Sequence, residues 1–92
     1  MTREEIQQKL MEMAAEKAGV SVLEVTPGTH LVNDLEFDSL DEMEYAMEVE
    51  DEFKLSVPDE ELDKFKTVGE VVDFVAQQRG ADDDGEDKDA AA

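Results

Sequence analysis

The sequence predicts an all-α fold: a four-helix bundle with three longer helices, one short helix and a long first loop. Three observations support this prediction. Apolar residues recur at helical spacing in several segments, capping-box signatures precede two of these segments, and no segment alternates apolar and polar residues for long enough to form a sheet. The chain has 92 residues, which allows one small domain, and we place it at residues 1–80.

The first helix and the loop after it are marked by local signals. Thr2 and Glu5 form a capping-box signature at the start, and Gly19 is a residue type that commonly ends helices. The helical pattern then stops over residues 20–37, where Pro27 and other turn-forming residues occur. A loop of this length in so small a domain usually has a function.

Three more helices are expected after the loop. The second covers residues 38–53, a short third covers residues 59–62, and the last covers residues 67–79 and opens on a second capping box formed by Thr67 and Glu70. The apolar face of the last helix consists of Val68, Val71, Val72 and Val75.

The composition excludes several functions. Asp and Glu number 27 against 8 Lys and Arg, for a net charge of −19, so the chain has no basic patch with which to bind nucleic acid or an anionic membrane surface. It has no Cys and one His, and we therefore expect no metal site. No apolar run approaches the roughly 20 residues of a membrane span, and the charged start of the chain does not resemble a signal peptide. We expect a cytoplasmic monomer.

The composition changes sharply after Gly80. Residues 81–92 hold six acids and no branched or aromatic apolar residue. Such a segment cannot bury enough apolar surface to offset the entropy lost on ordering. We expect it to be a disordered acidic tail.

The second predicted helix is unusually acidic. Eight acids and no base lie between Asp38 and Glu52. Four of the acids share one face, Asp41, Glu44, Glu48 and Asp51, and the apolar residues Leu40, Met43 and Met47 lie beside them, away from a core face of Tyr45, Ala46, Val49 and Phe53. A solvated face is the plain alternative. However, like charge at this spacing without a balancing Lys costs stability, which favours a partner that bears Arg and Lys.

Ser39 stands at the start of this helix, between Asp38 and Asp41. Its position alone suits an N-cap, a role that Asp38 can also fill. Ser39 is not expected to be an enzymatic nucleophile, because no G-x-S-x-G elbow surrounds it and His30 has no evident third partner. We interpret His30 as an ordinary loop residue.

The stretch from Leu35 to Asp41, followed by the acids up to Phe53, resembles the attachment region of acyl carrier proteins. Val57-Pro58-Asp59-Glu60-Glu61 is similar to the next segment in that family, and residues 67–75 are similar to its last helix. The resemblance spans about residues 25–75. One departure is Glu36, which stands where the family usually has Gly, and another is a second helix less aliphatic than in housekeeping fatty-acid carriers.

The resemblance implies a non-enzymatic carrier. Ser39 would receive 4′-phosphopantetheine from coenzyme A through a separate phosphopantetheinyl transferase. The arm would carry acyl groups as thioesters to fatty-acid or related polyketide or specialised lipid enzymes with basic patches. The expected partner-binding residues are Asp38, Leu40, Asp41, Met43, Glu44, Met47, Glu48 and Asp51. The expected lining of an acyl pocket is Leu31, Val49, Leu62 and Val71.

Two alternatives remain at this point. The charge and size also suit an acidic interaction or inhibitor protein that mimics an anionic ligand, although this reading does not explain Asp-Ser-Leu at a helix start. A peptidyl or D-alanyl carrier is possible too, but such carriers usually have a less uniformly acidic second helix.

Overall fold

The computed structural model describes residues 2–79, and within them the fold is all-α, as predicted. The elements are α1 (Arg3–Ala18), the 3₁₀ turn η1 (Val22–Glu24), α2 (Ser39–Phe53), α3 (Asp59–Leu62) and α4 (Val68–Arg79). Over this range the only pairing of extended backbone is an isolated bridge between His30 and Thr67. The predicted tail at residues 81–92 lies outside the described residues.

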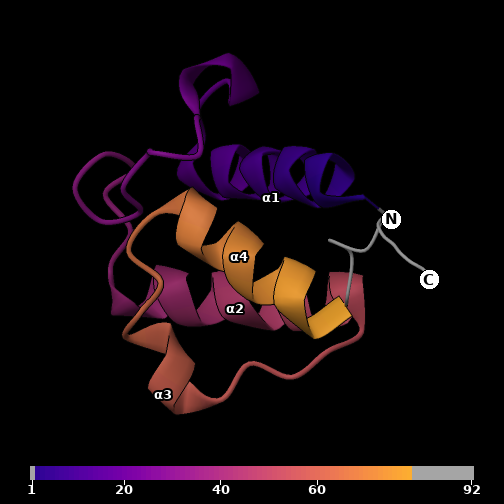
Figure 1. The fold of residues 1–92 in the computed structure, drawn as a ribbon. Helices are drawn as coiled ribbons and strands as arrows, with labels where there is room; N and C mark the ends of the chain where they lie inside the picture. Colours follow the sequence, from indigo (N-terminus) through magenta and orange to yellow (C-terminus); the bar gives the residue numbers. More distant parts are fainter. Residues whose placement is uncertain (1, 80–92) are drawn as a thin grey trace.

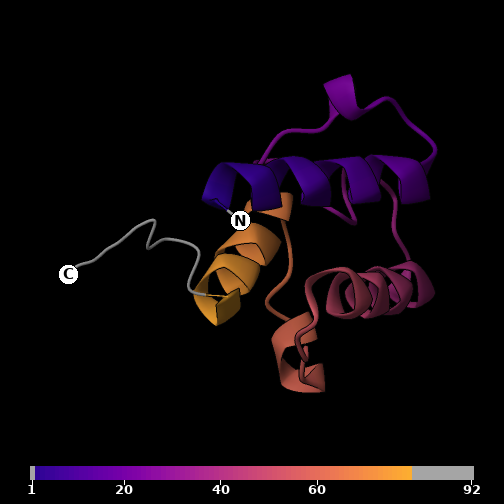
Figure 2. The same cartoon turned by 90° about the vertical axis from the view of Figure 1, so that its right-hand side faces the viewer.

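Helix α1 lies across both α2 and α4, and α3 packs beside α2 (Figure 1). Figure 2 shows α4 and α2 on two different sides beneath α1. Helix α1 runs in the opposite direction to α2 and α4, so the starts of α2 and α4 lie at the same end of the bundle (Figure 1). The long loop between α1 and α2 returns to this end.

The predicted ends of α1 are confirmed by its capping contacts. The Thr2 hydroxyl accepts a hydrogen bond from the Glu5 N–H (3.2 Å), and the Thr2 N–H donates to Glu5 Oε1 (2.7 Å). Gly19 ends the helix at φ 76°, a left-handed conformation that Gly adopts at little cost. Both signals act over a few residues, which is why the sequence alone locates them.

The core is made by one face of each long helix. The predicted core faces of α2 and α4 are confirmed as buried. The largest fully buried side chains are Ile6, Leu10, Leu31, Tyr45, Val49, Phe53, Val68, Val71, Val72 and Val75. Within the described range, no helix is both long enough and apolar enough to span a bilayer.

Backbone hydrogen bonds attach the long loop to the start of α4. The Leu31 N–H donates to the Lys66 carbonyl (2.9 Å), and the Gly69 N–H donates to the Pro27 carbonyl (2.8 Å). A Cβ at Gly69 would lie 3.0 Å from that carbonyl oxygen, so only Gly permits this approach without a shift of the backbone. These hydrogen bonds fix the middle of the loop, at Pro27 and Leu31, against the start of α4 before the chain enters α2.

Candidate functional site

Ser39 is the first residue of α2 and its side chain is exposed. Of the two predicted caps, Asp38 takes the role: Asp38 Oδ1 accepts from the Asp41 N–H (2.8 Å), and Asp41 Oδ2 accepts from the Asp38 N–H (3.1 Å). The helix is thus closed by a capping box made of two carboxylates. The Ser39 hydroxyl is left available for chemistry at the surface.

The open end of α2 suits an anionic group on Ser39. The Asp41 N–H is used by the cap, and the Glu42 N–H donates to the Asp38 carbonyl (3.0 Å). Among residues 2–79, no acceptor is present for the N–H groups of Ser39 and Leu40. Free amides and the positive end of the helix dipole attract negative charge at this point. A phosphodiester attached to Ser39 therefore fits this end of the helix.

His30 organises the loop that leads to Ser39. The ring Nδ1 of His30 accepts hydrogen bonds from the backbone N–H groups of Val32 (3.2 Å) and Asn33 (3.0 Å). The backbone N–H of His30 donates to Asp34 Oδ2 (2.7 Å). These bonds need an unprotonated Nδ1. The interpretation of His30 as an ordinary loop residue missed this role, for which the spacing of His30 and Asp34 was the only local signal.

Glu36 and Phe37 connect this loop to α2. Glu36 has φ 61°, in the left-handed region where side chains other than Gly are strained. Phe37 is buried, its N–H donates to the Leu31 carbonyl (3.0 Å), and its ring meets Tyr45 edge to face at 5.8 Å between centroids. The buried ring holds the backbone before Ser39 against the core.

Of the acidic stripe, Glu44, Glu48 and Asp51 are exposed and Asp41 is half-buried. The apolar residues beside the stripe are exposed, so this side of α2 is not covered by a second helix among the described residues. The exposed fractions are 59% for Leu40, 51% for Met43 and 62% for Met47. A hollow of about 500 Å³ on this surface is lined by Glu44, Met47, Glu48 and Asp51. In the described part of the chain no three Asp, Glu or His side chains gather to hold a metal ion. We call Asp38, Leu40, Asp41, Met43, Glu44, Met47, Glu48 and Asp51 together the α2 face.

The expectation that the acidic stripe lacks a balancing Lys is wrong. Lys17 of α1 places its Nζ 3.1 Å from Glu44 Oε1 and 3.2 Å from Glu48 Oε2. The error arose because the charges were counted along α2 alone. Bases on a helix that packs against it can only be assigned once the packing is known.

The four expected acyl-pocket residues are not gathered around one open cavity. Leu31, Val49 and Val71 are fully buried in the core. Leu62 is partly buried and lines a pocket of about 370 Å³ beside the start of α2. The other residues around this pocket are His30, Val32, Asn33, Glu42, Asp63, Phe65 and Lys66.

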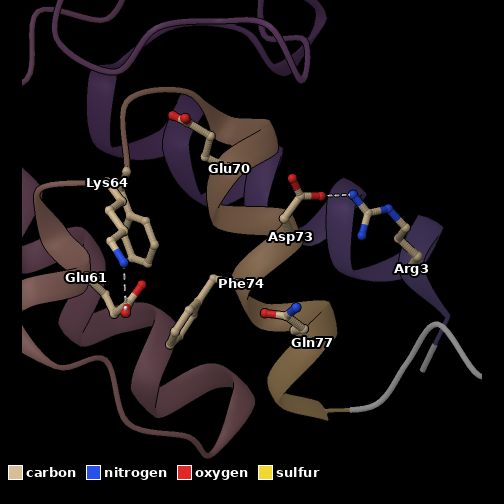
Figure 3. A pocket seen from close by; sticks show the side chains of 8 residues that line it. Arg3, Glu61, Lys64, Glu70, Asp73, Phe74 and Gln77 are labelled. Carbon is tan, nitrogen blue, oxygen red and sulfur yellow. Dashed lines mark hydrogen bonds and ion pairs between the residues drawn. The ribbon is translucent and has the colours of Figure 1, made fainter.

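A separate pocket of about 430 Å³ lies between α4 and the α3–α4 link (Figure 3). At its edges Arg3 forms an ion pair with Asp73, and Lys64 Nζ lies 3.6 Å from Glu61 Oε2. Phe74 projects between these two pairs (Figure 3). Neither Ser39 nor any residue of the α2 face lines this pocket, so it does not belong to the predicted site.

Comparison with known proteins identifies the class first. Residues 8–75 match the family model described as the phosphopantetheine attachment site. Together with the helical bundle and the exposed Ser at the start of α2, this match defines the chain as a carrier domain. The cofactor of such a domain is 4′-phosphopantetheine.

Relatives and solved structures then name the family. The chain is 48% identical over 81 residues to the acyl carrier protein of Rubrobacter xylanophilus, covering 88% of this chain and 100% of that protein. It is 38% identical over 80 residues to the acyl carrier protein of Lactobacillus acidophilus, covering 87% and 100%. The solved acyl carrier protein from Enterococcus faecalis superposes with a TM-score of 0.72 at 36% identity, covering 84% of this chain and 98% of that one. This chain belongs to the acyl carrier protein family, whose members carry acyl groups and usually serve fatty-acid biosynthesis.

Proposed function

We propose that Ser39 is the attachment point of 4′-phosphopantetheine and that the chain itself catalyses no reaction. The observation that carries this proposal is the exposed Ser39 hydroxyl at the start of α2, with Asp38 rather than Ser39 as the cap. When attached, the arm supplies a terminal thiol that holds acyl groups as thioesters. Ser39 contributes the acceptor oxygen, and the amides at the start of α2 stabilise the negative charge of the phosphodiester.

Asp38 has a different role from the amides. Its carboxylate repels a phosphate on the neighbouring residue, so it is not a ligand for the arm. One of its oxygens accepts the hydrogen bond of the cap, and Asp38 is exposed. We assign Asp38 to capping and to the contact with partner proteins.

The α2 face is the proposed docking surface for a phosphopantetheinyl transferase and for acyl-processing enzymes with basic, partly apolar patches. Glu44 and Glu48 have side chains 48% and 50% exposed, and Leu40, Met43 and Met47 are also exposed. Opposite charges speed the encounter of two proteins and add only modest affinity, which suits a carrier that must leave each partner.

The acyl chain is proposed to enter the core at Leu31, Val49, Leu62 and Val71. Leu62 borders an open pocket, whereas the other three side chains are closed in, so admission of a chain requires them to move apart. The acidic-inhibitor alternative loses its basis, because the chain belongs to a carrier family. The cytoplasmic location and the monomeric state stay predictions.

Attachment is tested by the intact mass after incubation with coenzyme A, Mg²⁺ and a phosphopantetheinyl transferase. The wild type is expected to gain one phosphopantetheine, and Ser39→Ala to stay folded and gain none. Ser56→Ala is the matched control, because Ser56 is also exposed but lies in the loop after α2, and this variant is expected to be modified like the wild type. Modification of Ser39→Ala, or no modification of the wild type, would refute the assignment.

Docking is tested by the rate of the same transfer across ionic strength. Glu44→Gln with Glu48→Gln is preferable to charge reversal, because two new Lys side chains would crowd Lys17 and threaten the fold. The double variant is expected to lower kcat/KM about 3- to 10-fold at low salt and much less at high salt.

Two controls separate a local effect from overall charge. Glu60→Gln with Glu61→Gln removes the same charge from α3, and removal of residues 81–92 also makes the chain less negative. Both are expected to slow transfer less than the α2 variant does. Equal effects in all three proteins would mean that the partner responds to net charge and that the α2 face has no special role.

A further inference from the structure

Lys17 is the one base in residues 2–79 that contacts the acids of the α2 face. It lies in the last turn of α1, and its side chain is only 14% exposed. Its Nζ reaches Glu44 Oε1 at 3.1 Å and Glu48 Oε2 at 3.2 Å. Because Glu44 and Glu48 are one helical turn apart on α2, a single ammonium spans the middle of the face.

The contact with Lys17 leaves one oxygen of each carboxylate available to a partner protein. Lys17 contacts one oxygen of each Glu, and about half of each Glu side chain remains exposed. The hydrogen bond with Glu44, followed by the contacts with Glu48, raises the pKa of the Lys17 ammonium above its ordinary value of 10.5, against the opposing effect of burial. The positive charge is therefore present throughout the neutral range.

We propose that Lys17 is a positioning residue that holds Glu44 and Glu48 in place and weakens the attraction of the α2 face for the cations of a partner. This inference rests on the proposed docking function of the face. A Lys or Arg of the partner that approaches Glu44 or Glu48 also approaches the Lys17 ammonium, and like charges repel. Lys17 thereby limits how fast and how tightly the carrier docks.

Lys17 has two effects, repulsion of the partner's cations and ordering of Glu44 and Glu48, and these effects differ in how they depend on salt. Repulsion between Lys17 and the partner acts at long range, so it lowers the association rate and is screened by salt. The ordering of two Glu side chains acts only after contact and depends little on salt. The dependence of the transfer rate on ionic strength therefore distinguishes a tuning charge from a merely structural Lys.

The test compares Lys17→Gln, Lys17→Arg and Lys9→Gln in phosphopantetheine transfer from low to high salt. Lys17→Gln is expected to raise kcat/KM about two- to fivefold at low ionic strength, and the gain should vanish near 1 M, where the screening length is about 3 Å. Lys17→Arg keeps the charge and should behave like the wild type.

Lys9→Gln is the matched control, because Lys9 also joins α1 to α2. Its partner Glu52 (3.5 Å) lies outside the α2 face. The same change in net charge at this position should give less than half of the gain. An unchanged or lower rate for Lys17→Gln, or an equal gain for Lys9→Gln, would overturn the proposal.

Folding and function are separated by two further measurements. Thermal melts verify that each variant is folded, and Lys17→Met repeats the test with the apolar part of the side chain kept if Lys17→Gln does not fold. The proposed docking function and the proposed role of Lys17 can fail separately. If the double variant Glu44→Gln with Glu48→Gln slows transfer but Lys17→Gln gives no gain, the docking proposal stands and the role of Lys17 is refuted.

Discussion

Glu36 and Lys54 have left-handed backbone conformations, at φ 61° and 57°. Glu36 lies in the last part of the loop before α2, and Lys54 is the C-cap of α2, where its N–H donates to the Glu50 carbonyl. For a residue with a Cβ this conformation costs about 1–2 kcal/mol. Both positions lie next to an end of α2, and a Gly at position 36 would remove this cost.

Glu36→Gly is expected to stabilise the protein. Relief of the backbone strain exceeds the extra freedom that Gly brings to the unfolded chain, and the net gain should be about 0.5–1 kcal/mol, or a rise of several degrees in Tm. The measurement is thermal unfolding followed by circular dichroism.

Glu36→Ala is the control for the lost negative charge, because Ala keeps a Cβ in the same strained conformation. It should give a clearly smaller rise in Tm than Glu36→Gly. If both variants were stabilised equally, the gain would come from reduced charge repulsion and not from the backbone.

Tyr45 joins helices α1 and α2 at the scale of whole elements. Its hydroxyl donates to the Leu10 carbonyl (2.9 Å), and its ring is almost fully buried. Burial, with a smaller contribution from the nearby charge of Glu48, raises the pKa of Tyr45 far above its ordinary value of 10.0. The phenol is therefore neutral whenever the two helices are packed together.

Stability is expected to fall above about pH 10. The unfolded chain loses the Tyr45 proton near the ordinary pKa of 10.0 while the folded chain keeps it, so the unfolded state binds fewer protons and gains stability as the pH rises. Lys17, whose folded pKa is raised above 10.5, acts in the same direction, since its stabilisation is complete below that value and is lost as the pH rises through the folded pKa. The measurement is Tm between about pH 8 and pH 11.

The chain has one Tyr and no Trp, so tyrosinate absorbance reports Tyr45 alone. It should appear together with the loss of helical circular dichroism. Tyr45→Phe loses a buried hydrogen bond worth about 1 kcal/mol at neutral pH, but its Tm should fall less steeply at alkaline pH than that of the wild type. A folded protein that forms tyrosinate near pH 10 would contradict this account.

Arg79 makes a second link between elements. Its Nη1 donates to the Phe53 carbonyl (2.7 Å) at the end of α2. A cation at this position also interacts favourably with the negative end of the α2 dipole. The last residue of α4 thus caps the end of α2. This contact joins the two helices at the end of the bundle opposite to Ser39.

Across the whole molecule, the few bases of α1 face other helices. Arg3 pairs with Asp73 of α4, Lys9 with Glu52 and Lys17 with Glu44 of α2. The exposed pairs Arg3–Asp73 and Lys9–Glu52 each contribute little to stability, about 0–1 kcal/mol. Their arrangement places the positive charge of α1 between helices and leaves an excess of carboxylates on the outer side of α2, where a basic partner can meet them.

Much of this architecture could be predicted from the sequence because its causes are local. The Thr2 capping box, the stop at Gly19 and the core faces of α2 and α4 depend on residues within one or two helical turns of each other. The same periodicity separated Leu40, Met43 and Met47 from the core face, and the structure shows that these three residues are exposed. The similarity to acyl carrier proteins was readable for the same reason, since its motif is a continuous segment around Ser39.

The tertiary structure alone decided which distant groups meet. It set Lys17 against Glu44 and Glu48, and it gave Glu36 its left-handed conformation, because both depend on how the long loop and α1 return to α2. Periodicity assigns a residue to one face of its own helix, but it contains no information on the helix that covers that face. The sequence by itself therefore determined the helices, the core faces of α2 and α4 and the family, and the packing of those helices decided the charge balance of the α2 face.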